Sequence, residues 1–230
     1  MTFVKMNNPS NFELDVSIAK FKVIKNGNSN RKFIWLHGDE KTAKMALEYH
    51  INRYPGTAYL FENDSREINI LNGIIDPIRI FSKAGAKKNL NKSNPYWSRN
   101  KKKTVLDSIS SARTILFKEL FSDQESIVIS LHNNYKGYNI RSEINNSDEI
   151  SIKKNQNPRD FFLCTNENDY NILAKSPFNA VLQKITPSID DGSLSWAALG
   201  KKTRYINIET RLGWLSVQKK MLIYLEENIP

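Results

Sequence analysis

Two histidines and a glutamate are the residues of this chain best suited to hold a metal ion. His37 and Glu40, three positions apart, follow the apolar run 33–36 and precede a helix-forming stretch. His132 follows a second apolar run, in IVISLHNNY. A catalytic zinc ion takes imidazole nitrogen and carboxylate oxygen from three protein ligands and leaves a fourth position open to water. The alternative is an ordinary polar turn in which Glu40 only favours the start of a helix.

A third apolar run, in YINIETRLGW, ends in Glu209. Water activated by a metal needs a carboxylate that takes its proton and passes it to the leaving nitrogen. Glu209 is our candidate for this role, and a salt bridge with Arg204 or Arg211 is the structural alternative. Two asparagines beside the second histidine, Asn133 and Asn134, are equally suited to contact a substrate or to form a turn.

Other polar residues have simpler interpretations. His50 lies in a predicted helix without an acidic partner at metal spacing, so we expect it to be structural. Asp39 is expected in a turn or cap, with orientation of a ligand imidazole as the alternative. Asp190 and Asp191 fall in a predicted turn. Cys164 is the single cysteine, which excludes an internal disulfide, and we expect it in the core.

The elements that would position these residues alternate between strands and helices. The expected strands are Phe21–Ile24, Phe33–Leu36, Thr57–Phe61, Ile68–Leu71, Ile127–Leu131, Phe161–Cys164, Ala180–Gln183 and Tyr205–Ile208. The expected helices are Thr42–Arg53, Thr104–Phe121, Glu167–Lys175, Leu194–Gly200 and Trp214–Asn228. This order predicts an α/β fold with a mixed, mostly parallel central sheet and helices on both faces. Ligands of such folds bind beyond the carboxyl ends of the strands, which is where the candidate side chains stand.

Composition indicates a globular protein. The chain has 230 residues, of which 40% are hydrophobic and 25% charged, so it can form one large domain or two small ones. No apolar run approaches the roughly 18 residues of a membrane span. Residues 1–15 lack a basic-then-apolar leader pattern, and we therefore expect a cytoplasmic protein.

The formal charge of +10 favours anionic partners. Residues 78–106 contain nine basic and no acidic side chains, and we expect a solvated lysine-rich loop there. The alternative is a binding module for nucleic acid or another polyanion, with Tyr96 and Trp97 stacking on bases beside Arg99 and the lysines 101–103. No fold pattern of nucleic-acid-binding proteins accompanies this stretch, so nucleic acid is not the partner we expect.

Four segments, in order, resemble motifs of the zinc carboxypeptidase superfamily, including its succinylglutamate desuccinylase/aspartoacylase branch. They are LHGDEKTA (36–43), DPIRIFS (76–82), SLHNNY (130–135) and INIETRLG (206–213). The resemblance implies one zinc ion per chain, held by His37, Glu40 and His132. It also implies that Arg79 binds a substrate carboxylate or polarises the scissile carbonyl, and that Glu209 is the general base.

Two features depart from the family pattern. Ile78 stands where the motif has an asparagine that would hold a substrate carboxylate, which leaves the substrate class open. The chain ends soon after Glu209, without the extra C-terminal β-domain of the desuccinylase branch, so we expect a single catalytic domain over residues 1–230. The substrate tyrosine of the carboxypeptidases has three candidates here, which are Tyr135, Tyr138 and Tyr205.

The sequence thus predicts a zinc-dependent hydrolase that cleaves a peptide or amide bond in a carboxylate-bearing substrate. Trimming of a peptide C-terminus and deacylation of an N-acyl amino acid both fit. Substrate contacts are expected from Arg79, Asn133, Asn134 and Tyr135. Two alternatives stay open: the polyanion-binding module, and a catalytically silent relative that keeps its zinc, which Ile78 suggests. Other metal ions that accept nitrogen and oxygen ligands fit the same residues.

Overall fold

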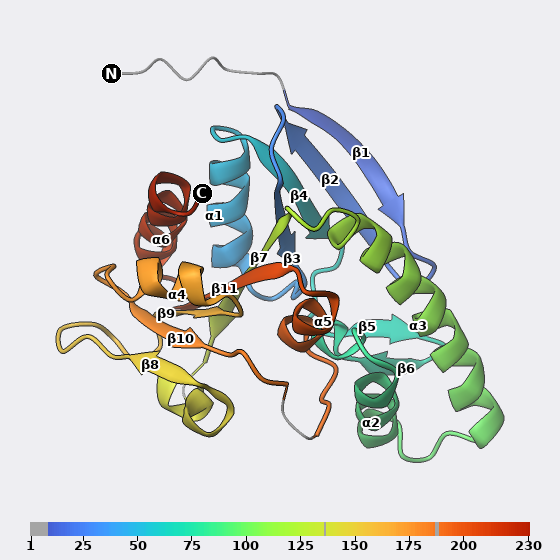
Figure 1. Cartoon of the computed structure of the whole chain (residues 1–230). Helices are drawn as coiled ribbons and strands as arrows, with labels where there is room; N and C mark the ends of the chain where they lie inside the picture. Colours follow the sequence, from blue (N-terminus) through green and yellow to red (C-terminus); the bar gives the residue numbers. More distant parts are fainter. Residues whose placement is uncertain (1–8, 136, 187–188) are drawn as a thin grey trace.

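A nine-stranded mixed sheet is the central element of the computed structural model, which describes residues 9–135, 137–186 and 189–230 (Figure 1). The strand order is β1-β2-β4-β3-β7-β11-β9-β10-β8, and β5 and β6 pair separately. The strands are β1 (Ser10–Asp15), β2 (Lys20–Asn26), β3 (Arg31–Trp35), β4 (Gly56–Phe61), β5 (Ile68–Ile70), β6 (Gly73–Ile75), β7 (Ile127–Asn134), β8 (Glu149–Ser151), β9 (Phe161–Cys164), β10 (Asn179–Leu182) and β11 (Arg204–Arg211). Residues 1–8, part of the segment searched for a leader pattern, lie outside the described residues.

The four strands at the centre of the sheet, β4, β3, β7 and β11, run parallel to one another. Antiparallel neighbours flank them, with β2 beside β4 and β9 beside β11. All eight residues of β7 are buried, as expected for a parallel strand that is covered on both faces. The predicted mixed sheet with mostly parallel central strands is therefore confirmed.

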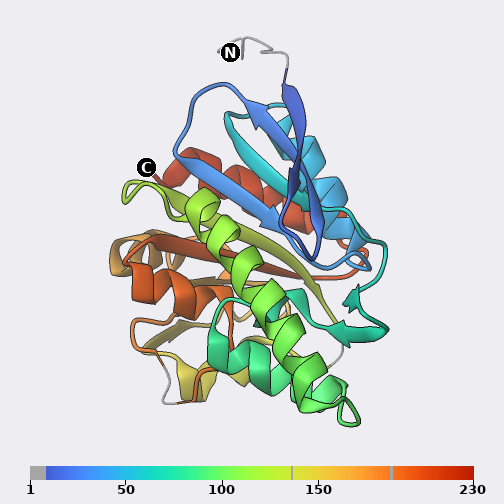
Figure 2. The same ribbon diagram turned by 90° about the vertical axis from the view of Figure 1, so that its right-hand side faces the viewer.

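Helices cover both faces of this sheet, as predicted. They are α1 (Lys41–Ile51), α2 (Lys83–Ser93), α3 (Arg99–Leu120), α4 (Glu167–Leu173), α5 (Leu194–Lys201) and α6 (Leu215–Asn228), with 3-10 helices η1 (Pro77–Arg79) and η2 (Ile140–Asn146). Helices α1 and α6 pack together on one face, and α3 and α5 lie on the other (Figures 1 and 2). Helix α3 buries Val105, Ile109, Ala112 and Leu116, a three-to-four-residue spacing that places one apolar stripe against the core. Among the described residues, no helix is both long enough and apolar enough to span a bilayer.

Two strands reach further than the sequence pattern indicates. We expected His132 and Glu209 just beyond their strands, but β7 continues to Asn134 and β11 to Arg211. Pairing between these two strands is unbroken to their ends, and His132 and Glu209 are direct partners in its register. The extension matters because it places both side chains on neighbouring, rigid strands instead of loops.

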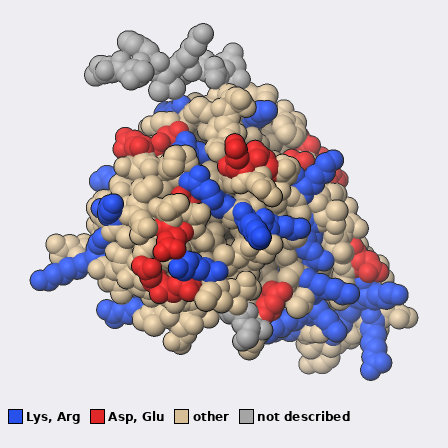
Figure 3. Space-filling view, viewed as in Figure 1, with Lys and Arg blue, Asp and Glu red and all other residues tan. Residues whose placement is uncertain are grey.

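The lysine-rich segment is helical, so the prediction of a loop there is wrong. Residues 83–93 form α2 and residues 99–103 begin α3. The side-chain hydroxyls of Ser82 and Ser98 accept hydrogen bonds from the first turns of these helices, as N-caps do. The sequence signal was weak because α2 buries only a few small or apolar residues. Lys and Arg side chains gather over this part of the surface (Figure 3).

Two helical glycines should respond to alanine in opposite directions. At Gly85, in α2, a Cβ would overlap the backbone of Gly192, whereas at Gly200, in α5, it would meet nothing within 4 Å. We expect Gly85→Ala to lower the free energy of unfolding by about 1–3 kcal/mol through overpacking. Gly200→Ala should raise it by about 0.5–1 kcal/mol because alanine favours a helix. Urea denaturation of both variants checks this, and a Gly85→Ala variant as stable as the native chain would contradict it.

Candidate metal centre

The turn after β3 points two ligand-type side chains inward. Gly38 lies so close to the backbone of Asn63 that a Cβ would overlap it, and its N–H donates to the carbonyl of Ser65 at 2.9 Å. The backbone N–H of Glu40 donates to the carbonyl of His37 at 3.0 Å and closes the turn. The glycine thus lets the turn pack under the segment after β4, and both side chains become buried.

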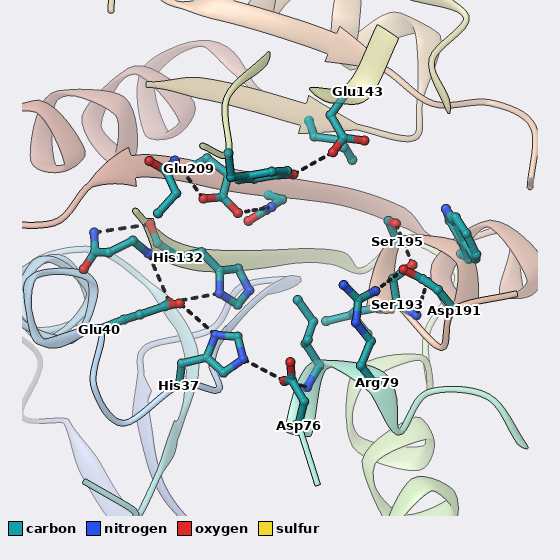
Figure 4. Close-up of a pocket in the computed structure, with 18 of the residues that line it drawn as sticks. His37, Glu40, Asp76, Arg79, His132, Glu143, Asp191, Ser193, Ser195 and Glu209 are labelled. Carbon is teal, nitrogen blue, oxygen red and sulfur yellow. Dashed lines mark hydrogen bonds and ion pairs between the residues drawn. The ribbon is translucent and has the colours of Figure 1, made fainter. Parts of the chain in front are cut away.

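The carboxylate of Glu40 joins the two histidines (Figure 4). Its Oε1 lies 2.7 Å from Nδ1 of His37, and its Oε2 lies 3.0 Å from Nδ1 of His132. The backbone N–H of Asn133 donates to Oε2, and the guanidinium of Arg66 donates to Oε1. Glu40 occupies the N-cap position of α1, but its side chain makes no capping hydrogen bond. The geometry therefore does not support the reading of Glu40 as a simple helix-start acid.

A second carboxylate orients the first histidine. Oδ1 of Asp76 lies 2.9 Å from Nε2 of His37 and also accepts the backbone N–H of Ile78 at 3.1 Å. A proton on Nε2 leaves the Nδ1 lone pair free for a ligand, the arrangement that a metal-binding histidine needs. Asp39, the alternative that the sequence offers for this role, accepts a hydrogen bond from Tyr135 instead. Asp76 was missed, although it opens the DPIRIFS segment.

The three side chains fit a metal ion. One donor atom from each of His37, Glu40 and His132 lies within 4.8 Å of the others, a spacing that a single ion about 2 Å from each can bridge after small adjustments. The two imidazole centroids are 5.1 Å apart. Burial opposes the charge of Glu40, but the two imidazoles hold its pKa well below the usual range and keep it anionic. This buried group could hold a metal.

Strand alternation carries a row of polar side chains toward the same pocket. Successive residues of a strand point to opposite faces of the sheet. On β7 the row is Ser130, His132 and Asn134, and on β11 it is Tyr205, Asn207 and Glu209. Asn133 faces the other side, where its Oδ1 accepts the backbone N–H of Ala43 and its Nδ2 donates to Gln218. The side chain of Asn133 is therefore committed to joining β7 to α1 and α6.

Glu209 is held by amides. It is only 6% exposed, and it accepts hydrogen bonds from Nδ2 of Asn207 and Nδ2 of Asn134, each at 3.1 Å. Burial raises the pKa of Glu209, the charge of Glu40 raises it further, and His132 and the two amides lower it. The net upward shift suits a group that must accept a proton near neutral pH and later release it.

The arginines next to Glu209 in sequence pair elsewhere. Arg204 donates to Asp169 at 2.6 Å, and Arg211 donates to Asp160 at 2.7 Å. The salt-bridge alternative for Glu209 is thus not what the chain forms. Arg211 lies two residues beyond Glu209 at the end of β11, where its guanidinium is held by both carboxylate oxygens of Asp160.

The pocket over this group has a volume of about 390 Å³. Arg79, at the end of η1, lies across it from the histidines, and its Nη1 donates to Asp191 (Figure 4). Ile78 also lines the pocket. All three candidate tyrosines line it as well: Tyr135 is 50% exposed at the rim, whereas Tyr138 and Tyr205 are hydrogen-bonded inside. The pocket therefore brings the predicted ligands, Arg79 and Glu209 together.

Asn134 supports the pocket and does not face it freely. Its Nδ2 donates to Glu209 and to the carbonyl of Arg159, and its Oδ1 accepts from Nε of Arg159 at 3.0 Å. Tyr135 donates to Asp39 at 3.2 Å. Of the predicted substrate contacts, Arg79 and Tyr135 keep polar groups at the pocket surface, whereas both asparagines are engaged by the protein.

Of the two aromatic residues considered for base stacking, Tyr96 and Trp97, one is engaged by contacts within the protein. Trp97 packs so closely on Gly73 that a Cβ there would overlap its ring, and Nζ of Lys101 lies 4.0 Å from the ring centroid. Only Tyr96, which is 98% exposed, is free to stack. His50 is buried, stacks on Tyr54 and lies outside the pocket, consistent with its expected structural role.

Comparison with known proteins finds likeness in structure alone. No protein-family model and no curated protein sequence matches the chain. A succinylglutamate desuccinylase from Silicibacter sp. TM1040 superposes with a TM-score of 0.51 at 12% identity, over 91% of this chain and 60% of that one. A succinylglutamate desuccinylase/aspartoacylase from Rhodobacter sphaeroides gives 0.47 at 11% identity, over 91% and 58%. The tripeptide-bound cell shape determinant Csd4 protein from Helicobacter pylori gives 0.45 at 12% identity, over 90% and 54%. The first likeness confirms the carboxypeptidase-like fold that the sequence motifs imply, and the chain spans 60% of that desuccinylase's length.

Asp76 offers a direct test of the metal site. Asp76→Asn removes the carboxylate that orients His37, so we expect affinity for Zn²⁺ to fall by about tenfold to a hundredfold. Competition with a chromogenic chelator measures this. Asp64→Asn, which changes an exposed carboxylate that pairs with Lys41 at the surface, is the control and should leave the affinity unchanged. Equal affinities of the two variants would contradict the assigned role.

Metal binding should also release a proton. Burial opposes the charge of His37, but Asp76 and Glu40 outweigh it and raise the pKa of His37 to about 9 in the metal-free chain. Because ligation needs a neutral imidazole, binding near pH 7.5 should release about one proton, and affinity should rise with pH until about 9. Calorimetry of Zn²⁺ binding in buffers of different ionisation enthalpy gives this number, and heats independent of the buffer would rule it out.

Proposed function

We propose that this chain, which shares the fold of a succinylglutamate desuccinylase, is a zinc-dependent hydrolase of a peptide or amide bond. One observation carries the proposal: the buried group of His37, Glu40 and His132 lies beside Glu209. Glu209 and His132 are direct partners in the register of β11 and β7. A group that can hold a metal and a buried carboxylate without a salt bridge to any described residue meet in one pocket. Both are needed to hydrolyse an amide with an activated water.

The metal would be held by His37, Glu40 and His132. A bound zinc ion supplies Lewis acidity and makes a coordinated water acidic enough to react near neutral pH. Arg66 donates to the Glu40 carboxylate and helps to keep it in place. Asp76 does the same for His37 from the other side of the ring.

Glu209 is the proposed proton carrier. Its two oxygens accept hydrogen bonds from Asn207 and Asn134, which fix its position without neutralising it. Its raised pKa makes it a better acceptor for the proton of the attacking water than an ordinary carboxylate. The same proton can then pass from Glu209 to the leaving nitrogen.

Arg79 is the proposed anchor for a substrate carboxylate or for the developing oxyanion. Only its Nη1 has a side-chain partner among the described residues, Asp191, so its other N–H groups are available to a ligand. A planar guanidinium suits either acceptor. Because Ile78 provides no amide beside it, Arg79 would hold the carboxylate without that help.

The decisive variant is Glu209→Gln, which keeps the shape of the side chain and removes its basicity. We expect kcat on N-acyl amino acids or short peptides to fall by about a hundredfold to ten-thousandfold with zinc content unchanged. Glu227→Gln, an exposed position on α6, serves as the control and should keep full activity. Liquid chromatography of the products and elemental analysis of the protein provide the two readouts.

The same experiment distinguishes an active hydrolase from a catalytically silent relative. A native chain that binds zinc but hydrolyses none of a broad panel of peptides and acyl amino acids is the catalytically silent relative that Ile78 suggests. Turnover that persists in Glu209→Gln would reject the assignment of the base and leave the metal site intact.

A further inference from the structure

The wall of the pocket formed by η2 carries an acidic residue that the proposed chemistry does not use. Glu143, in the middle of η2, lines the pocket on the side away from the histidines (Figure 4). Its Oε1 accepts a hydrogen bond from the hydroxyl of Tyr138 at 2.8 Å. The pocket thus presents a carboxylate here, although the formal charge of the chain is +10.

This carboxylate differs from three other acids of the pocket, which have cationic partners; the fourth, Glu209, is held by two amides. Glu40 lies against two imidazoles and an arginine, Asp76 against His37, and Asp191 against Arg79. In contrast, no cationic group lies within 4.0 Å of the Glu143 carboxylate among the described residues. The charge of Arg79 acts on Glu143 only from beyond that distance, and Arg79 is paired with Asp191. A partly buried carboxylate without a direct counter-charge is costly unless a ligand supplies one.

An unsatisfied acceptor lies on the same wall as Glu143. Gln183 is 2% exposed and lines the pocket, and its Oε1 has no hydrogen-bond partner in the described part of the chain. Its Nε2 donates to the carbonyl of Asn146, the last residue of η2, at 3.2 Å. The 3-10 helix therefore ties Gln183 to the wall that carries Glu143. Among the described residues, Glu143 receives one side-chain donor, the Tyr138 hydroxyl, and the Oε1 of Gln183 receives none.

We propose that Glu143 and Gln183 form a subsite for a primary ammonium group of the substrate. This inference rests on the proposed function. It gives the substrate a positive charge in addition to the carboxylate that Arg79 would bind. An ammonium has three donors and no acceptor, which complements a carboxylate and an amide oxygen. One oxygen of Glu143 is already bonded to Tyr138, so the two-pronged contact that a guanidinium prefers is less favoured.

The size of the pocket fits such a substrate. About 390 Å³ accommodates a single residue with a long side chain rather than a large peptide. The carboxylate of that residue would lie at Arg79 and its scissile amide near Glu209, and the ammonium at the end of its aliphatic side chain would reach Glu143. The substrate class is therefore a peptide or N-acyl derivative of an amino acid that carries a second amine. Burial raises the pKa of Glu143, and a bound ammonium would favour its charged form.

Binding is measured without turnover, in zinc-loaded protein carrying Glu209→Gln. Calorimetry compares N-acetylated dipeptides that end in lysine, norleucine, arginine or glutamate. We expect the lysine peptide to bind about tenfold to a hundredfold more tightly than the norleucine peptide, as a charge-assisted hydrogen bond predicts. Adding Glu143→Gln should abolish this ratio. Adding Glu125→Gln, which changes an exposed loop residue, should leave it intact.

The subsite would be overturned if the norleucine, glutamate or arginine peptide bound as tightly as the lysine peptide or more tightly. It would also be overturned if the lysine peptide did not bind detectably, or if the lysine-to-norleucine affinity ratio survived Glu143→Gln. Thermal unfolding of Glu143→Gln controls for folding, because glutamine can still accept the Tyr138 hydrogen bond. The native chain failing to hydrolyse any substrate would count against the proposed function but not against this binding ratio. Turnover without lysine selectivity would count against the subsite alone.

Discussion

The buried carboxylate of Glu40 is the constraint on which the site depends. A charge removed from water must be compensated by nearby donors, and here two imidazoles, an arginine and a backbone N–H converge on its two oxygens. These donors come from the turn after β3, from the segment after β4 and from β7, which are far apart in the chain. One side chain thereby sets the relative positions of three elements. The same convergence makes a set of ligands for a cation, which would replace the contacts between Glu40 and the histidines.

The sheet supplies the rest of the site through its alternation. His132 and Glu209 share a face because they are register partners on parallel strands, and the residues beside them in sequence must point the other way. Side chains on that opposite face hold helices to the sheet. Asn133 and Gln218 use it to bind α1 and α6 to the sheet, so the strands that carry the reactive groups are anchored from behind. A site built on two central strands is stiffer than one built on loops.

The polarity of the pocket is divided between its two ends. The histidines and Glu209 lie at one end, and the neutralised pair of Arg79 and Asp191 lies at the other, with Glu143 on the adjoining wall. The surplus positive charge of the chain is largely elsewhere, over α2 and α3 on the outer surface. The net charge therefore describes the outer surface of this protein. Inside the pocket, the electrostatic potential depends on the individual charged side chains and the groups that pair with them.

The sequence by itself determined the local elements and the identity of the reactive side chains. Apolar runs located the central strands, and the motifs around His37, His132 and Glu209 identified residues that the structure brings into one pocket, because strand order and side-chain type are local properties. It did not reveal Asp76, Arg66, Glu143 or Gln183 as parts of the pocket wall, nor that Asn133 faces away. Those facts depend on which strands pair and in which register, and a shift of one residue would turn His132 and Glu209 to the opposite face. Long-range packing alone makes that choice, so only the tertiary structure could decide what each polar residue touches.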